Sequence, residues 1–290
     1  MPQPEPPVGR TASATDESFE GWEASAGGWE RRRAFVWEAS RKVSERLVDL
    51  LDPQPGQSLL ELAAGTGDTG FLAAERIRPA GRLISSDFVP GMVAAAQRRA
   101  VELSVSNVDF RVLDAQALDL ADESVDGVLC RWGYMLVPEP AKAFAETARV
   151  LRPGGHVAFA VWASADENPL VSAIGRVLVA RGLVARPEPD APGPFRLADP
   201  EHVRALVENA GLELVRQEDV ALTWRFGGFD EYWDVTRDLS RSLAASLEEI
   251  DEEKSEAIKA DVRQALEPYD EQGGLALPAL TRVALVRRPR

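Results

Sequence analysis

Cysteine and histidine are nearly absent from this 290-residue sequence. The single cysteine, Cys130, excludes an internal disulfide and a thiolate metal cluster. Two histidines, His156 and His202, leave little material for a histidine-rich metal site or for a Ser-His-Asp triad. The composition therefore disfavours zinc-dependent and serine hydrolases, and we expect no bound metal and a structural role for each histidine.

Long apolar runs and a basic excess are also missing. No run is long enough to cross a membrane, and the first residues lack the charged-then-apolar pattern of a secretory signal. Only 33 Lys and Arg stand against 47 Asp and Glu, so the formal net charge is −14. Such a charge repels nucleic-acid phosphates. We expect a cytoplasmic protein with no membrane span and no nucleic-acid partner, either a monomer or a homodimer.

The segment 58–77 holds the most informative pattern in the chain. Its first five residues read as a short buried strand, a glycine turn follows, and a helical pattern then begins. Glycines at such a corner tolerate positive φ and carry no Cβ, so a ligand can lie against backbone N–H groups at the helix N-terminus. The spacing G-x-G-x-x-G, which predicts a nucleotide-binding corner, is formed by Gly65, Gly67 and Gly70.

Strand and helix patterns alternate along residues 53–165, which predicts an α/β fold with a doubly wound parallel sheet. After this first strand, apolar runs predict four more parallel strands at 82–86, 108–113, 124–130 and 156–162. Two later strand patterns, 212–224 and 280–286, are separated by the charged helical segment 229–268.

Composition along the chain suggests its division into parts. The proline-rich start is typical of disorder, and the helical stretch after it contains Trp22, Trp29 and Trp37, which we interpret either as core anchors or as part of a lid. The expected parts are a disordered tail at 1–16, an N-terminal helical lid at 17–52, a binding core at 53–165, a cap insertion at 166–198, a continuation of the core at 199–226, a helical cap insertion at 227–272 and the last strand at 273–290.

Acidic side chains mark the carboxyl ends of the first three predicted strands: Glu61, Asp87 and Asp114. Open α/β sheets bind ligands in the crevice at these ends. Asp87 suits two ribose hydroxyls, with a plain helix cap as the alternative, and Asp114 suits an exocyclic adenine amine, because an ionised carboxylate only accepts. Glu61 either accepts from an ammonium group or orients the glycine turn. Together the three acids indicate a positively charged nucleoside without phosphates.

In combination these segments resemble the class I S-adenosylmethionine-dependent methyltransferases, and within them the branch similar to the ubiquinone/menaquinone C-methyltransferases. The resemblance covers about residues 45–165 and implies a Rossmann-like, seven-stranded sheet with the last strand antiparallel beside the sixth, and with helical cap insertions. The segments that match the family's motifs in order are Leu59–Gly67, Ser86–Phe88, Leu113–Ala115, Val128–Trp132 and Leu151–Gly155.

The resemblance also implies the ligand and the residues that hold it. The cofactor would be S-adenosylmethionine, with S-adenosylhomocysteine as product. Carried over by position, Gly65 and Gly67 would meet its methionine end, Asp87 its ribose, and the backbone of Arg131 and Trp132 would close the methionine side. Asp114, Phe88 and Ala115 would meet the adenine, and Glu61, Ala63 and Met92 complete the expected cofactor-binding set.

Methyl transfer is an in-line displacement at a sulfonium carbon, so positioning is the main task and no dedicated catalytic residue is required. Tyr134 is the candidate contact to the acceptor, with a core or lid role as the alternative. We expect an aromatic or apolar small-molecule acceptor, although the same side chains fit packing under the cap. Its expected wall consists of Trp132, Tyr134, Met135, Trp162 and Phe195.

Two other functions fit the same sequence. An NAD-dependent oxidoreductase would share the glycine spacing and Asp87, but it has no need for Glu61, for Asp114 or for the fifty residues before the first strand. A member of the same fold that binds the cofactor as a sensor or scaffold, or uses it for another reaction, would carry all of these features.

Overall fold

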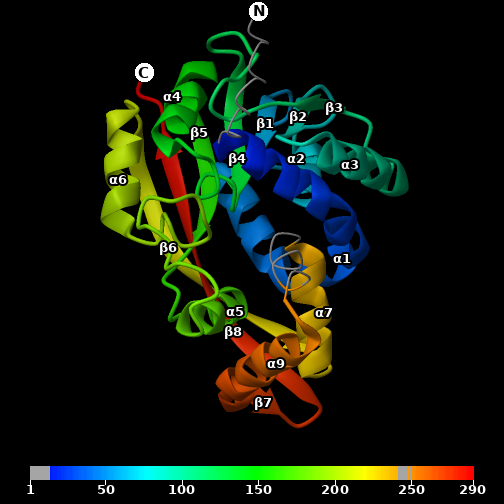
Figure 1. Ribbon diagram of the computed structural model, residues 1–290. Coiled ribbons are helices and arrows are strands. Elements are labelled where there is room, and N and C mark those ends of the chain that lie inside the picture. Colours follow the sequence, from blue (N-terminus) through cyan, green and yellow to red (C-terminus); the bar gives the residue numbers. More distant parts are fainter. Residues whose placement is uncertain (1–13, 241–246, 248–249) are drawn as a thin grey trace, which may run out of the picture.

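The computed structural model describes residues 14–240, 247 and 250–290, and these form a mixed sheet covered by helices (Figure 1). The strand order is β3-β2-β1-β4-β5-β8-β6, and β7 pairs with β8 beside this path. The strands are β1 (Ser58–Leu62), β2 (Arg82–Asp87), β3 (Val108–Val112), β4 (Val125–Arg131), β5 (Leu151–Trp162), β6 (Glu213–Phe226), β7 (Asp270–Glu271) and β8 (Gly274–Arg287).

Local sequence explains where several helices begin. Four of them carry proline in the first turn, where the missing N–H has no intrahelical partner to lose. Asp199 caps one of these by accepting from the N–H of Glu201 at 2.9 Å. The helices are α1 (Ala14–Leu51), α2 (Asp68–Arg76), α3 (Pro90–Leu103), α4 (Pro140–Val150), α5 (Pro169–Ala180), α6 (Pro200–Asn209), α7 (Phe229–Leu239) and α9 (Glu252–Leu266), followed by the 3-10 turn η1 (Glu267–Tyr269).

The strand directions confirm the predicted fold class. The strands β1 to β5 pair in parallel, and β8 runs antiparallel to both β5 and β6. An eighth strand, the two-residue β7, forms a hairpin with the start of β8 and was not predicted. The fifth parallel strand, predicted at 156–162, is longer than expected, because β5 begins at Leu151 and includes Pro153–Gly155.

The pair β6 and β8 continues beyond the rest of the sheet. The last residue of β5, Trp162, pairs with Thr281, whereas β8 begins seven residues earlier at Gly274 and remains paired with β6 as far as Phe226. This two-stranded ribbon therefore projects past the carboxyl ends of the parallel strands. The helices α5, α7 and α9 lie around the projecting end, in the lower part of Figure 1.

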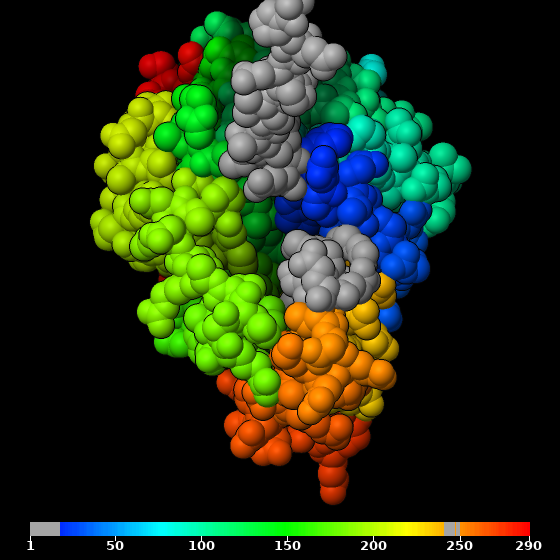
Figure 2. Space-filling model, viewed as in Figure 1, coloured from blue at the N-terminus to red at the C-terminus, as the bar shows by residue number. Residues whose placement is uncertain are grey.

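The three helices α5, α7 and α9, which we call the cap helices, contact each other and α1. Figure 2 shows α5, in green, against α9, in orange, and Arg181 joins the two helices through an ion pair with Asp261 at 2.7 Å. On the other side, a Cβ added to Gly28 of α1 would lie 1.7 Å from the carbonyl oxygen of Asp238 in α7. The sequence therefore needs glycine at this crossing of α1 and α7.

The long helix α1 has two environments. Its second half lies on the sheet, where Val43 and Leu47 are fully buried. Its first half packs against the start of α3 through Ala26, with Trp22 and Trp29 beside it. The residues before Ala14, which belong to the predicted tail, lie outside the described part of the chain. In that described part, no helix combines the length and the apolar character needed to cross a bilayer.

Candidate active site

The turn between β1 and α2 has the backbone conformation that its glycines predict. Gly65 and Gly67 have φ of 55° and 84°, and Ala63 also lies in the left-handed region at 50°. A Cβ added to Gly65 would meet nothing within 4 Å, whereas one on Gly67 would lie 2.5 Å from the ring of Phe71. The turn is therefore packed underneath and leaves open backbone at Gly65, the surface that a ligand requires.

Glu61 lies beneath this turn with an exposed fraction of only 2%. One carboxyl oxygen accepts from the N–H of Gly70 at 2.7 Å, and the other from the hydroxyl of Ser85 at 3.2 Å. Burial raises the pKa of Glu61 to about 8, although the Gly70 N–H and the Arg131 guanidinium act in the opposite direction. Of its two predicted roles, the geometry fits orientation of the turn.

Asp87 joins the end of β2 to the turn. Its Oδ2 accepts from the N–H of Gly65 at 2.8 Å, and its Oδ1 from the N–H of Val89 at 3.3 Å. Burial is the main cause that raises the pKa of Asp87 to about 6. A carboxylate has about four acceptor positions, so two remain for ligand hydroxyls. Asp87 does not cap α3 in the usual sense, because its bond goes to the N–H of the N-cap residue Val89 and not to the first turn of the helix.

Asp114 follows β3 and already contacts an amide group. The side-chain NH₂ of Gln116 donates to its two oxygens at 3.1 and 3.3 Å, and the Gln116 N–H donates at 2.9 Å. The carbonyl of the same amide accepts from the N–H of Glu139 at 2.8 Å. An NH₂ group thus occupies the position predicted for the adenine amine, and sequence reasoning missed Gln116. The backbone just before Asp114 is joined to Asp87, because the N–H of Leu113 donates to the Asp87 carbonyl at 3.0 Å.

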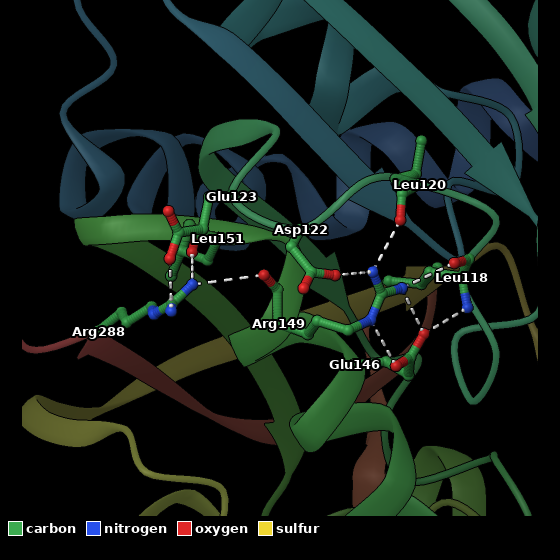
Figure 3. A network of polar contacts seen from close by, with 8 residues as sticks. All are labelled: Leu118, Leu120, Asp122, Glu123, Glu146, Arg149, Leu151 and Arg288. Atoms are coloured by element: carbon green, nitrogen blue, oxygen red, sulfur yellow. Dashed lines mark hydrogen bonds and ion pairs between the residues drawn. The ribbon is translucent and has the colours of Figure 1, made fainter.

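The chain after Asp114 is held in place by a polar network on α4 (Figure 3). The guanidinium of Arg149 donates to the carbonyls of Leu118 and Leu120 at 2.8 and 2.7 Å. Glu146, one turn earlier on α4, pairs with Arg149 and accepts from the N–H of Leu118 at 2.8 Å. These contacts fix the loop that presents Asp114 and Ala115 at the sheet edge.

The first half of α1 covers the neighbouring end of β2. Phe19 meets the ring of Phe88 edge-on, with centroids 5.5 Å apart. Glu23 accepts from the N–H of Gly91 at 2.9 Å and so caps the start of α3. Met92 is 3% exposed and packs below these residues. Sequence reasoning missed Phe19 and Glu23, because nothing in the helical pattern of α1 indicates which helix it meets.

The end of β4 carries two aromatic rings and a cation. Trp132 has φ of 61° and stacks on Trp162 with centroids 4.2 Å apart. Its indole N–H donates to the hydroxyl of Thr281 at 3.2 Å. The guanidinium of Arg131 lies over the Trp132 ring at 4.8 Å and donates to the hydroxyl of Ser40 in α1 at 2.5 Å. A non-glycine residue in the left-handed region is typical of functional sites.

Tyr134 is a core residue, so the predicted acceptor contact is wrong and its alternative holds. The side chain is 1% exposed. Its ring lies between Phe144, at 4.3 Å, and Phe159, at 5.5 Å between centroids. Its hydroxyl pairs with the hydroxyl of Thr147 at 2.8 Å. These partners belong to the sheet face that α4 covers, opposite the face that α1 covers.

Of the other residues predicted to form the acceptor wall, two pack in or against the core and two lie at the carboxyl edge of the sheet. Met135 is 2% exposed, and its carbonyl accepts from the N–H of Gly193 at 3.1 Å. Phe195 packs, partly buried, against the main core. Only Trp132 and Trp162 are brought together at the carboxyl edge, where they are 7% and 6% exposed. The acceptor wall predicted from sequence therefore reduces to this stacked pair.

Neither histidine lies in this group. His156 pairs with Gly127 in the first half of β4, and burial lowers its pKa. His202 lies in the first turn of α6. Across residues 14–240, 247 and 250–290, no group of three or more His, Cys, Asp and Glu is placed to hold a metal ion.

Comparisons with known proteins agree with this geometry. Residues 59–155 match the family model described as "Methyltransferase domain". The chain is 33% identical over 193 residues to an arsenite methyltransferase from Halobacterium salinarum, which is 66% of this chain and 46% of that protein. It is 35% identical over 125 residues to a demethylmenaquinone methyltransferase from Thermus thermophilus, 43% of this chain and 56% of the relative. The chain thus spans about half the length of these curated relatives.

A solved structure shows the same fold at lower identity. The [4+2]-cyclase SpnF superposes with a TM-score of 0.54 and 21% identity, over 87% of this chain and 82% of the SpnF chain. At this identity the likeness concerns the fold alone.

Proposed function

Because the chain carries a class I S-adenosylmethionine-dependent methyltransferase domain of the ubiquinone/menaquinone C-methyltransferase type, we propose that it transfers a methyl group to a small aromatic or apolar acceptor in an enclosed site. The observation that carries the proposal is the position of Asp87. Its carboxylate joins the end of β2 to the glycine turn through Gly65 and keeps acceptor capacity for a ribose.

The residues at the carboxyl edge fit this cofactor. Open backbone at Gly65 suits its methionine end, and Asp87 suits its ribose hydroxyls. Asp114 binds an amide NH₂ in the structure, which is the donor chemistry of an adenine amine. Phe88 and Ala115 are partly buried beside these acids, as an adenine-binding wall requires. We assign the cofactor to this group.

The cofactor supplies a methyl group activated by its sulfonium charge. The chain's own residues then have three tasks, which are to bind, to orient and to exclude water. Glu61 and Asp87 fix the turn from below and from the side. The stacked pair Trp132 and Trp162 gives an apolar surface at the end of β4. We propose that the helices α5, α7 and α9, which lie around the projecting end of β6 and β8, help to enclose this edge.

We propose a small molecule rather than a nucleic acid as the acceptor. The net charge of −14 disfavours a phosphate backbone. The stacked tryptophans favour a flat or apolar group, and the demethylmenaquinone methyltransferase among the relatives is named for an acceptor of this kind. The described residues at the edge include no histidine base, so positioning is proposed as the main source of rate.

A labelled-methyl assay tests the proposal. The full chain is incubated with S-adenosylmethionine carrying a labelled methyl group and with quinols, phenols and small-molecule extracts, and label entering the organic phase is counted. We expect transfer that depends on the protein, and the Asp87→Ala variant should lose it. Cofactor binding without transfer to any of these acceptors would contradict methylation.

The second candidate is a member of the fold that binds the cofactor without methylating. SpnF shares the fold and is named as a cyclase, so the architecture alone does not fix the reaction. An NAD-dependent reaction is disfavoured by Asp68. This acid occupies the first turn of α2, where a pyrophosphate would have to bind, and it is held there by Thr66 and Arg99.

A further inference from the structure

Arg131 is a partly buried cation at the end of β4, and desolvation lowers the pKa of its guanidinium. It ends β4 and points toward α1, where its Nη1 donates to the hydroxyl of Ser40 at 2.5 Å. In the part of the chain that the structure describes, no carboxylate forms an ion pair with it, and its other close partner is the ring of Trp132. A guanidinium has five N–H donors, so most of its donor capacity is unused.

The acids that interact electrostatically with Arg131 are Glu61 and Asp68, and each has closer partners of its own. Asp68 accepts from the hydroxyl of Thr66 at 2.9 Å and pairs with the Arg99 guanidinium at 3.0 Å. Glu61 is bound to the turn, and its raised pKa, about 8, leaves it largely protonated at neutral pH. A buried guanidinium without a counter-charge is costly. An anionic ligand group would supply the missing charge.

The contacts of α1 place the guanidinium beside the glycine turn. Ser40 and Ser44 are one helical turn apart, about 6 Å along the axis. Ser44 pairs with the hydroxyl of Thr69, in the first turn of α2, at 2.8 Å. The Arg131 side chain, bound at Ser40, therefore lies one turn of α1 away from this contact with α2, and it interacts electrostatically with Asp68 in the first turn of α2 and with Glu61 beneath the glycine turn. This is where the proposed function places the methionine end of the cofactor.

We propose that the Arg131 side chain binds the α-carboxylate of the methionine end and thereby selects ligands that carry a complete amino-acid group. This deepens the proposed function and rests on it, because it assumes that an adenosyl ligand binds in this crevice. The expectation from sequence concerned only the Arg131 backbone. The planar fork of a guanidinium matches a carboxylate better than an ammonium does.

Two ligands that differ only at this end provide the test. S-adenosylhomocysteine has the amino-acid group, and 5′-methylthioadenosine has the same adenosine and thioether without it. Calorimetric titration measures the affinity of three full-length proteins, the wild type, Arg131→Met and Arg131→Lys, for each of the two ligands. Arg152→Met is the matched control, since Arg152 pairs with Asp126 at 2.6 Å, away from the crevice.

We expect Arg131→Met to lower the affinity for S-adenosylhomocysteine about 30-fold, which corresponds to the loss of a hydrogen bond to a charged group. The affinity for 5′-methylthioadenosine should change by less than about twofold. The S-adenosylhomocysteine affinity of Arg131→Lys should lie between those of the wild type and Arg131→Met, because lysine keeps the charge but lacks the planar, two-pronged guanidinium. Arg152→Met should change neither. Equal effects of Arg131→Met on both ligands, or none, would overturn the inference.

Three further outcomes are also decisive. If Arg131→Met does not fold, a wild-type ratio of the two affinities in Arg131→Lys overturns the inference, and a lowered ratio supports it. If the wild type binds neither ligand, the proposed function itself is wrong, and the assignment of Arg131 falls with it. A wild type that binds 5′-methylthioadenosine as tightly as S-adenosylhomocysteine leaves the crevice in place but contradicts the role of Arg131.

Discussion

The carboxylate of Asp87 and the backbone N–H of Gly65 are joined by a 2.8 Å hydrogen bond across 22 residues of sequence. This contact ties the end of one strand to the turn that follows its neighbour. The same carboxylate accepts from the N–H of Val89 at the start of α3. One side chain therefore shapes two walls of the crevice, and its protonation state affects the ligand and the turn together.

Ligand binding should weaken in mild acid because of Asp87. Its pKa is raised to about 6, so the ionised form, which accepts from ribose hydroxyls, prevails at pH 7 and is lost as pH falls through 6. We expect S-adenosylhomocysteine affinity to fall about tenfold between pH 7 and pH 5. Asp87→Asn should bind weakly at both pH values. Asp49→Asn, which changes an exposed residue that pairs with Arg76 on the surface, should behave as wild type, and a pH-independent wild type would refute the role of Asp87.

The buried carboxyl of Glu61 should make stability depend on pH. Its folded pKa, about 8, lies above its ordinary value of 4.5, so the folded state holds a proton that the unfolded state releases. The stability that this gives is complete below about pH 4.5 and is lost as pH rises to about 8. Glu61→Gln keeps an acceptor for the Gly70 N–H and cannot ionise. In thermal melts from pH 5 to pH 8.5, the melting temperature of the variant should rise relative to that of the wild type as the pH increases. Melting temperatures that change in parallel with pH would contradict this role of Glu61.

Gly70→Ala tests the contact between Glu61 and α2. The added Cβ would lie 2.1 Å from a carboxyl oxygen of Glu61, which is held on its other side by Ser85. We expect the free energy of unfolding to fall by about 2 kcal/mol, which is a typical cost of overpacking a core. Gly175→Ala is the control, because that helical position has nothing within 4 Å and should gain about 0.5–1 kcal/mol. Denaturant unfolding of both variants measures the difference, and equal effects would show that the contact is not tight.

Removal of the Tyr134 hydroxyl should affect stability alone. Its partner is the hydroxyl of Thr147, and its ring packs on Phe144. Tyr134→Phe should cost about 1 kcal/mol, since the Thr147 hydroxyl loses its buried partner. Cofactor affinity and methyl transfer should stay at the wild-type level. A selective loss of transfer with unchanged unfolding would return Tyr134 to the acceptor site.

Much of the cofactor crevice is predictable because its signals are local. A buried strand, glycines with positive φ and acids at strand ends act within a few residues of each other, and β1 was predicted with its observed bounds, Ser58–Leu62. The acids then meet because parallel strands end at one edge. Gln116 was missed because its contact with Asp114 becomes visible only when the loop conformation is known.

The acceptor side was harder to predict because long-range packing decides it. Tyr134 lies only two residues after Trp132, yet the left-handed turn at Trp132 sends the two rings to different faces of the sheet. The start of β8 was also missed. Its residues 274–279 include a proline and carry apolar side chains without alternation, so the strand was recognisable only from its pairing with β6.

Calorimetric titration of the full chain with S-adenosylmethionine, S-adenosylhomocysteine and NADH tests the central claim most directly. The crevice of Glu61, Asp87 and Asp114 predicts about micromolar binding of both adenosyl ligands and no heat with NADH. Binding of NADH alone would contradict the account, because it would leave the three acids and the open turn at Gly65 without the ligand assigned to them.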